Sequence, residues 1–285
     1  MKLSRTLRRS VPVLFVAPFL TLLPATAQSQ SAGEILQTAL ERYEARTEGI
    51  DNYTVIQEVM GLSTTTYFEK ESVDGHPVFR MSSSSVQGMG ESDDLDDEAV
   101  TNPYQFLPEL TERATLDGSE TVDGLDTWAV SVEDFSGLDF GAPTGDEGDF
   151  RPTRGVFYLD KDDYLLRQMR VEGELEREGE SAPVTMVARI GDYREVEGLL
   201  HPFRIDMQIE GITAAVSEEE RAEMEQQMEQ LQQQLESMPE SQREMAEGMM
   251  GPQLEQMREM LSSGAMEMTL EVTELRVNEG PPGGS

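Results

Sequence analysis

The side chains that most often carry chemistry are scarce in this sequence. It holds two histidines, His76 and His201, and no cysteine. Each histidine directly precedes a proline, and no Gly-x-Ser-x-Gly turn supplies a nucleophile for either one. The HExxH metal motif, the P-loop and the dinucleotide-binding glycine pattern are also missing. We therefore expect two structural or exposed histidines, no cofactor and no enzymatic activity.

Carboxylates gather in two short runs, Glu91 to Glu98 and Asp146 to Asp149. Such oxygens could bind calcium, and the stretch from Asp160 places aspartates at the first and third positions of a calcium loop. The twelfth position, where a bidentate glutamate is needed, is Val171. We expect solvated acidic loops and no metal site.

The overall charge excludes one class of partner. The sequence has 56 acidic and 22 basic side chains, a formal net charge of -34. Nucleic-acid binding requires a basic surface, and an anionic membrane would repel this chain. Beyond the N-terminal segment the only lysines are Lys70 and Lys161. This composition fits a halophilic protein, in which salt screens the repulsion between acidic side chains. It also fits a protein that recognises a basic partner or divalent cations.

The first 27 residues have the pattern of a signal peptide. Four basic residues precede an apolar run from Val11 to Leu23, and Ala25-Thr26-Ala27 is a small-residue cleavage site. Cleavage after Ala27 would remove those four charges and take the net charge from -34 to -38. The run is too short for a stable transmembrane anchor. We expect an exported protein without a membrane anchor after signal removal.

Alternating apolar residues predict an antiparallel meander between Arg154 and Glu210, because successive side chains of a strand point to opposite faces. Turn residues separate its strands. The alternating sets are Val156 and Tyr158; Leu165, Arg167, Met169 and Val171; Val184, Met186, Ala188 and Ile190; and Phe203, Ile205, Met207 and Ile209.

The flanking segments predict a helix and further strands. Apolar residues recur at helical spacing in 32–47, and strands are expected in 53–60, 62–69, 77–81 and 127–133. Residues 82–98 and 136–151 are expected to be mobile acidic loops, and 103–111 a short helix or lid. Alternation resumes in 264–278, with a bulge near Thr273-Glu274, and 279–285 is expected to be a disordered tail.

Residues 217–263 have a different pattern from the predicted strands. Methionines and leucines recur there at helical spacing in a Gln- and Glu-rich sequence. They predict a helical hairpin inserted between two strands of one domain, formed by 28–216 and 264–278. Such a hairpin could be a lid, or its apolar stripe could simply be a buried seam. The candidate lid residues are Met224, Met228, Leu231, Leu235, Met245 and Met249.

Several sequence segments resemble those of a known protein family. FYLDKDDYLLRQMRVEGE (157–174), DYREVEGLLHPFRIDM (192–207), ATLDGSETVDGLDTWAVSVED (114–134) and the opening helix and strand at 32–59 resemble the LolA/LolB-like outer-membrane lipoprotein-sorting superfamily. The resemblance implies an α+β fold, with an incompletely closed antiparallel β-barrel, an N-terminal helix and the helical insertion as lid. It also implies a periplasmic protein whose apolar interior holds acyl chains.

Two hypotheses follow. In the first, the chain is a carrier or binding protein for lipid or lipoprotein acyl chains. In the alternative, side chains fill the barrel and the insertion binds an envelope protein partner. Arg80, within an apolar stretch, could latch a lid or face solvent. The candidate cavity residues, which could equally be ordinary core, are Trp128, Tyr158, Met169, Met186, Phe203, Ile205 and Met207.

Overall fold

The computed structural model describes residues 30–59, 61–73, 75–86, 90–91, 103–136, 149–177, 180–211, 226, 228, 230, 233, 258 and 262–282. By internal contacts the chain divides into residues 1–30 and 31–285, and every element below belongs to the second unit. The expected signal peptide lies outside the described residues.

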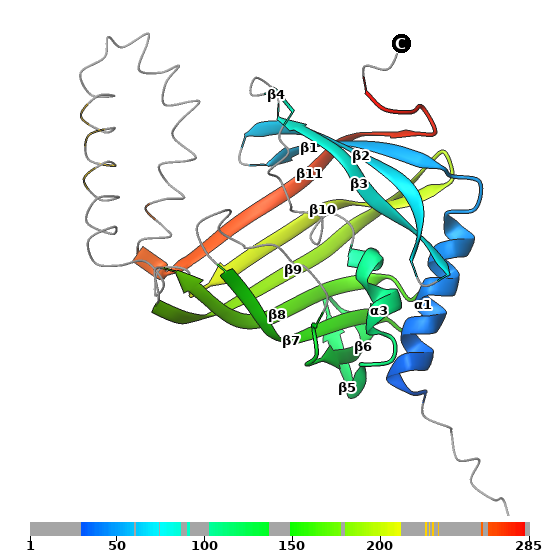
Figure 1. The fold of residues 1–285 in the computed structure, drawn as a ribbon, viewed down its shortest axis with the longest axis horizontal. Helices are drawn as coiled ribbons and strands as arrows, with labels where there is room; N and C mark the ends of the chain where they lie inside the picture. The colour runs from blue at the N-terminus through cyan, green and yellow to red at the C-terminus, as the bar shows by residue number, and fades with distance from the viewer. Residues whose placement is uncertain are drawn as a thin grey trace, which may run out of the picture. The chain divides into compact units, whose positions relative to one another are not determined.

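Among the described residues, this unit has one large sheet and three helical segments (Figure 1). The helical segments are α1 (Ala32–Arg46), η1 (Pro103–Phe106) and α3 (Leu107–Leu110). The strands are β1 (Asn52–Val59), β2 (Leu62–Val73), β3 (His76–Val86), β4 (Gly90–Glu91), β5 (Thr115–Val122), β6 (Leu125–Val132), β7 (Asp149–Asp160), β8 (Leu166–Arg177), β9 (Glu180–Val196), β10 (Leu199–Glu210) and β11 (Ala265–Val277).

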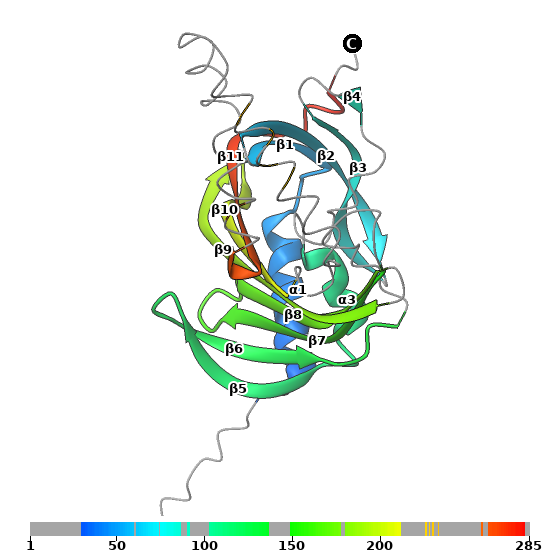
Figure 2. The ribbon, with the colours of Figure 1, turned by 90° about the vertical axis from the view of Figure 1, so that its left-hand side faces the viewer.

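The sheet is an antiparallel meander in which one strand is out of sequence order. Its strand order is β4-β3-β2-β1-β11-β10-β9-β8-β7-β6-β5, so the last strand lies between β1 and β10. No pairing joins the two ends of this order among the described strands. The sheet curves around α1 and α3 (Figure 2), which gives an incompletely closed barrel. The expected half-barrel is confirmed for the described residues.

Helix α1 begins and ends where local sequence favours it. Ser31 caps its first turn: the Glu34 amide donates to the Ser31 hydroxyl, and the Ser31 amide donates to the Glu34 carboxylate at 2.8 Å. Arg46 lies in the last turn, where a cation offsets the helix dipole. The chain leaves through Gly49, whose φ of 79° suits glycine.

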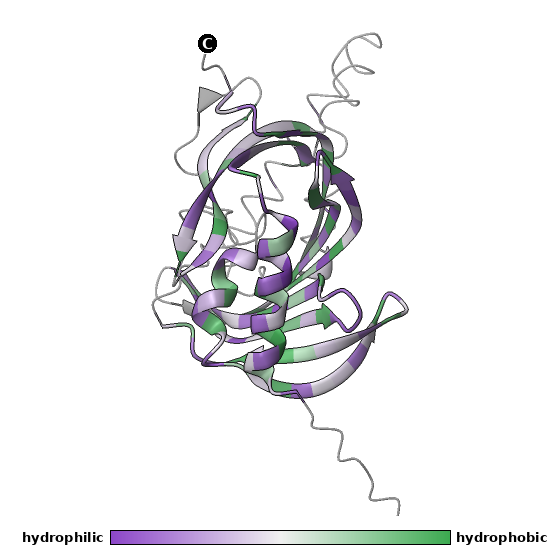
Figure 3. Cartoon of the chain, turned by 90° about the vertical axis from the view of Figure 1, so that its right-hand side faces the viewer, coloured by the Kyte–Doolittle hydropathy of each residue, from purple (hydrophilic) through white to green (hydrophobic). Residues whose placement is uncertain are grey.

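The main core lies between α1 and the concave face of the sheet, which we call the inner face. Ile35, Leu36, Ala39 and Leu40 of α1 are fully buried. They belong to one apolar cluster with Leu107 and Leu110 of α3 and with inner-face residues of β6 to β11. Hydrophilic and hydrophobic residues alternate along the strands (Figure 3), as required when one face packs on helices.

Several sequence-based expectations are met at the level of single residues. The predicted helix at 32–47 is α1, and the predicted strands coincide with β1, β2, β3, β6, β7, β8, β9, β10 and β11. The β1–β11 register passes from Ile56↔Glu274 to Gln57↔Val272, which leaves Thr273 as the extra residue of the predicted bulge.

Other expectations were wrong. Ser82 to Val86 is not loop, because β3 runs to Val86 and pairs with β2. Of the two alternatives for 103–111, the short helix is confirmed and the lid is wrong, because Leu107 and Leu110 are fully buried in the core. Strand β5 was not anticipated, because its sequence TLDGSETV carries little apolar alternation.

The sheet divides near its middle. Strands β10 and β11 pair from Arg204↔Glu271 to Glu210↔Ala265. Beyond this point β10 pairs only with β9, and β11 pairs only with β1, among the described strands. A second apolar cluster, which includes Tyr53, Phe203 and Leu275, packs at this fork. Among the described residues, no helix is long and apolar enough to cross a membrane.

Candidate functional site

Ladders of apolar side chains cross the inner face from β8 to β11. Directly opposed residues of antiparallel strands lie on the same face. Ile205 opposes Ile190 and Leu270, and the next rungs towards the C-terminal end of β10 are centred on Met207 and Ile209. Met207 opposes Ala188 and Met268, and Ile209 opposes Met186 and Met266.

The last two rungs combine the buried residues Ala188 and Ile209 with methionines that are less buried. Ile190, Ile205 and Leu270 are buried, whereas the methionines of the outer rungs are only half-buried. We call these four residues the methionine floor: Met186, Met207, Met266 and Met268. Met186, Met266 and Met268 border a small cluster of Leu175, Ala182, Val184 and Ile209 that contains no residue of α1 or α3.

The structure brings most of the candidate cavity residues together. Met169 and Ile205 are buried in the main core, and Trp128, Met186 and Met207 pack against it. Phe203 lies in the second cluster, at the fork. Tyr158 lies apart from all of these, in a cluster with Val122, Ala129 and Val156, whereas its neighbour Phe157 enters the main core.

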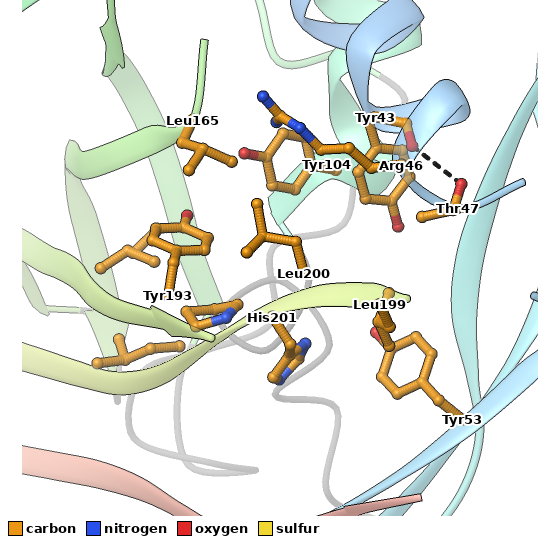
Figure 4. A pocket seen from close by; sticks show the side chains of 13 residues that line it. Tyr43, Arg46, Thr47, Tyr53, Tyr104, Leu165, Tyr193, Leu199, Leu200 and His201 are labelled. Atoms are coloured by element: carbon orange, nitrogen blue, oxygen red, sulfur yellow. Dashed lines mark hydrogen bonds between the residues drawn. The ribbon is translucent and has the colours of Figure 1, made fainter. Parts of the chain in front are cut away.

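A narrow pocket lies between the end of α1 and the β9–β10 hairpin (Figure 4). We call it the helix pocket. It is partly open to solvent. It is lined by Tyr43, Arg46, Thr47, Tyr53, Tyr104, Leu165, Ile190, Tyr193, Leu199, Leu200, His201, Pro202 and Ile205.

The tyrosine hydroxyls of this pocket are bound to the backbone. The Leu166 amide donates to the Tyr104 hydroxyl at 3.0 Å, and the Tyr193 hydroxyl donates to the Leu166 carbonyl at 2.7 Å. Burial raises the pKa of Tyr193 well above its usual value, so this hydroxyl remains protonated. These tyrosines therefore fix the start of β8 against β9 and η1.

An ion-pair cluster holds the turn between β7 and β8 against α1. Arg167 binds Asp160 at 3.0 Å and Asp163 at 2.7 Å. From α1, Arg42 donates to the Asp162 carbonyl at 2.6 Å, and Arg46 donates to the Asp163 carbonyl. The aspartates considered for calcium are thus engaged with arginines and backbone. Among the described residues, no group of three or more acidic, histidine or cysteine side chains could hold a metal.

A second pocket lies at the fork between β10 and β11, and we call it the fork pocket. It is partly open to solvent. It shares His201, Pro202 and Ile205 with the helix pocket. It is lined by Val55, Gln57, Thr66, Phe68, His201, Pro202, Arg204, Ile205, Leu270 and Val272.

The two histidines have different surroundings. His201 is 8% exposed, and its ring centroid lies 5.5 Å from Tyr53 and 6.5 Å from Phe203. Burial lowers the pKa of His201 from 6.5 to about 4, so the ring is neutral at neutral pH. His76 lies on the surface of β3, with Nδ1 2.7 Å from a Glu44 carboxylate oxygen.

The opposite, outer face of the same strands is charged. Arg204 binds Asp206 at 2.7 Å and Glu271 at 2.8 Å, and Arg276 binds Glu274 at 2.7 Å. Hydrogen bonds from Arg204 lower the pKa of Asp206. The two faces of one set of strands therefore present different chemistry.

Most of the expected lid falls outside the described residues. Of its candidate residues only Met228 is described, and it is helical and half-buried. The hairpin itself therefore stays a prediction. Arg80 was considered as a partner for such a lid. Its side chain is 40% exposed and lies 3.9 Å from Glu71, so it is a surface residue of β3.

Comparison with known proteins gives similarity of structure only. No protein-family model matches the sequence, and no curated protein does. A domain described as an outer-membrane lipoprotein-sorting protein from Vibrio parahaemolyticus matches with a TM-score of 0.38 and 11% identity, over 88% of this chain and 94% of that one. A LolA superfamily protein from Nitrosomonas europaea matches with a TM-score of 0.34 and 10% identity, over 86% and 94% of the two chains.

The chain is similar in structure to LolA-superfamily proteins. A DUF1329 family protein from Desulfovibrio piger also matches, with a TM-score of 0.40 and 12% identity over 88% of this chain and 95% of that one. These matches include the family that the sequence resembles.

Some residues of these sites were missed in the sequence. Met266 and Met268 were recognised as alternating strand residues but were not assigned to a cavity. Gln57 was overlooked, although it interrupts the apolar set of Tyr53, Val55 and Val59 on β1. That interruption was the available signal. Tyr193 had no signal, because its contact with Leu166 joins two strands.

Proposed function

We propose that this chain is an exported, non-enzymatic carrier or binding protein that shelters an acyl chain of a lipid or lipoprotein against its inner face. The observation that carries the proposal is the methionine floor, where methionine side chains continue the apolar ladders of the inner face but remain half-buried. An acyl chain laid on this floor would complete the burial that α1 and α3 provide elsewhere.

Methionine suits such a surface physically. Its unbranched, polarisable side chain adapts to apolar ligands of different shape. Transfer of a chain from water would contribute about 0.8 kcal/mol for each buried methylene group. The opposing cost is the ordering of the chain and of any segment that closes over it. A chain of ordinary fatty-acid length therefore offers enough apolar surface to bind.

The other end of the inner face is already occupied. Leu36, Leu40 and Leu107 are fully buried there, and the helix pocket is too narrow to take a whole chain beside them. We therefore assign the acyl chain to the methionine end of the sheet and not to the space around α1.

The connectivity supports the same location. Strand β10 ends at Glu210 and β11 begins at Ala265, and the Gly211 amide donates to the Gly264 carbonyl at 3.1 Å. The predicted insertion 217–263 thus leaves the sheet and returns to it next to the last rungs of the methionine floor. We propose that its helices are the lid over a bound chain.

The test is the identification of a co-purifying molecule. The full-length protein is expressed in a host that exports it and is purified without detergent. It is then analysed by native mass spectrometry before and after organic extraction. We expect a stoichiometric acylated molecule. A bare polypeptide mass that also takes up no added fatty acid or lipid would refute the carrier function.

Paired variants locate the site. Met207→Lys places a charge on the methionine floor, and Gln208→Lys places the same charge one residue away on the outer face. We expect only the first to lose the bound molecule. If circular dichroism shows that Met207→Lys does not fold, the milder substitution Met207→Gln is used in its place. Equal retention by both variants would exclude the methionine floor.

A second candidate function is a non-enzymatic interaction module that grips an envelope protein through its insertion. The fully packed core around α1 favours it, because that part of the barrel is filled by the chain itself. In that case deletion of 217–263 would abolish capture of a partner protein, and no acylated molecule would be extracted from the intact chain.

A further inference from the structure

The fork pocket contains polar side chains in an apolar setting. Gln57 is 8% exposed and Thr66 is 3% exposed, and both line the pocket with Val55, Phe68 and Leu270. No described residue forms a hydrogen bond with the Gln57 side-chain amide. Buried amides normally have partners. The Gln57 amide is not among the fully enclosed side-chain atoms that lack one, so it is reachable from the pocket and can form hydrogen bonds with a molecule there.

The pairing registers extend this polar surface over β2 and β3. Gln57 opposes Thr64 on β2, Val55 opposes Thr66, and Thr66 opposes Ser84 on β3. The Thr66 and Ser84 hydroxyls are 3.3 Å apart, so they lie on one face. We call Gln57, Thr64, Thr66 and Ser84 the polar strip. It belongs to the inner face, because Gln57 and Thr66 share the pocket with Ile205 and Leu270.

The pocket carries no free charge. The polar strip consists of amide and hydroxyl groups, and His201, buried beside Tyr53 and Phe203, is neutral at neutral pH. The one permanently charged side chain that lines the pocket, Arg204, is bound by Asp206 and Glu271. The strongly negative chain also disfavours an anion. An uncharged group that donates and accepts hydrogen bonds fits this surface best.

The fork pocket adjoins the methionine floor along the inner-face ladder. Ile205 and Leu270 line the pocket, and they form the rung of the inner-face ladder next to Met207 and Met268. One molecule can therefore contact the polar strip at one end and the methionines at the other.

We propose that the fork pocket binds the uncharged, hydrogen-bonding head of an amphipathic molecule, whose acyl chain lies on the methionine floor. The head is of the hydroxyl or amide class, as in an acylated glycerol or sugar, and is neither a carboxylate nor a phosphate. This inference rests on the proposed carrier function and specifies the ligand that the carrier selects.

Three probes with chains of equal length test the head preference: 1-oleoylglycerol, oleate and 1-octadecene. Each is delivered to the full protein from cyclodextrin at neutral pH, and binding is measured by calorimetry and native mass spectrometry. We expect 1-oleoylglycerol to bind at least about tenfold more tightly than either of the others, as for a few buried hydrogen bonds. Equal affinities, or a preference for oleate, would overturn the head assignment and leave the carrier function standing. Binding of none of the three would overturn both.

A pair of isosteric variants assigns the preference to the fork pocket. Gln57→Met removes the amide in the pocket, and Gln208→Met removes an amide on the outer face that donates to Glu210. We expect Gln57→Met to bind 1-oleoylglycerol and 1-octadecene with similar affinity, and Gln208→Met to keep the wild-type ratio. Thr66→Val gives an independent second variant should Gln57→Met unfold. An unchanged ratio in a folded pocket variant would refute the site.

Discussion

The inner face of this half-barrel has two ends that are built from similar strands but differ in how far their side chains are buried. Around α1 the side chains of Leu36, Leu107 and Phe157 are fully buried. At the methionine end, Met207 and Met268 continue the same ladders and remain half-buried. The first end is a core that the described residues complete by themselves. The second has the same apolar chemistry without a described cover, which is why the carrier proposal is placed there.

The largest contrast is expected from truncation at the two ends. Leu36→Ala should lower the free energy of unfolding by about 2–5 kcal/mol, because it leaves a cavity in a fully packed core. Met207→Ala should cost clearly less, since its side chain is already partly exposed. Urea denaturation followed by circular dichroism measures both. Equal losses would mean that the two ends are packed alike.

The fork should respond to acid through His201. The pKa of His201 is about 4 in the folded protein, and its ordinary value is 6.5. As pH falls, His201 therefore takes up a proton in the unfolded chain before it does so in the folded protein. Stability should therefore decrease from about pH 6.5 towards pH 4, by roughly 3 kcal/mol in total. His201→Gln should flatten the upper part of this profile, above the range in which carboxylates titrate. An unchanged slope between pH 6.5 and 5 would show that His201 is not buried as described.

The methionine end should be sensitive to a single added methyl group on β8. A Cβ at Gly173 would lie 2.6 Å from the Phe150 ring and 2.5 Å from the Arg151 carbonyl oxygen. Gly173→Ala should therefore cost about 1–3 kcal/mol by overpacking. Gly191, with open space around its Cβ position, is the matched control. A larger loss for Gly191→Ala would contradict this packing.

The smallest effect is expected on the outer face. Arg276→Gln removes an exposed ion pair with Glu274, and such pairs contribute little to stability. Its thermal unfolding midpoint should differ slightly from wild type at low salt and not at high salt. A loss comparable to that of Leu36→Ala would show that the charged face, and not the inner face, stabilises the sheet.

Much of the fold could be predicted from local patterns. The helix at 32–47 and the meander strands were found from apolar periodicity, and the bulge at Thr273 from a slip of that periodicity. Strand β5 and the extension of β3 through Ser82 to Val86 were missed, since their polar residues resemble loop sequence. These segments are strands because a neighbouring strand pairs with their backbone, and side-chain patterns do not report that pairing.

The candidate site was predicted only in part. Met186, Ile205 and Met207 were assigned to the interior from alternation and do lie on the inner face. Tyr158 was assigned by the same reasoning, but β7 places Phe157 towards the main core. Both residues are apolar, so alternation alone does not say which one faces inward.

The sequence alone determined the antiparallel sheet, the opening helix, the acidity and the lack of catalytic motifs, because each depends on residue type or on spacing along the chain. Only the tertiary structure decided that β11 lies between β1 and β10, that the sheet forks at Arg204 and Glu271, and that Gln57 shares a pocket with His201. These features join residues that lie far apart in the sequence, such as Arg204 and Glu271, which are 67 positions apart. Their geometry follows from the curvature and register of the whole sheet, which no local stretch of sequence encodes.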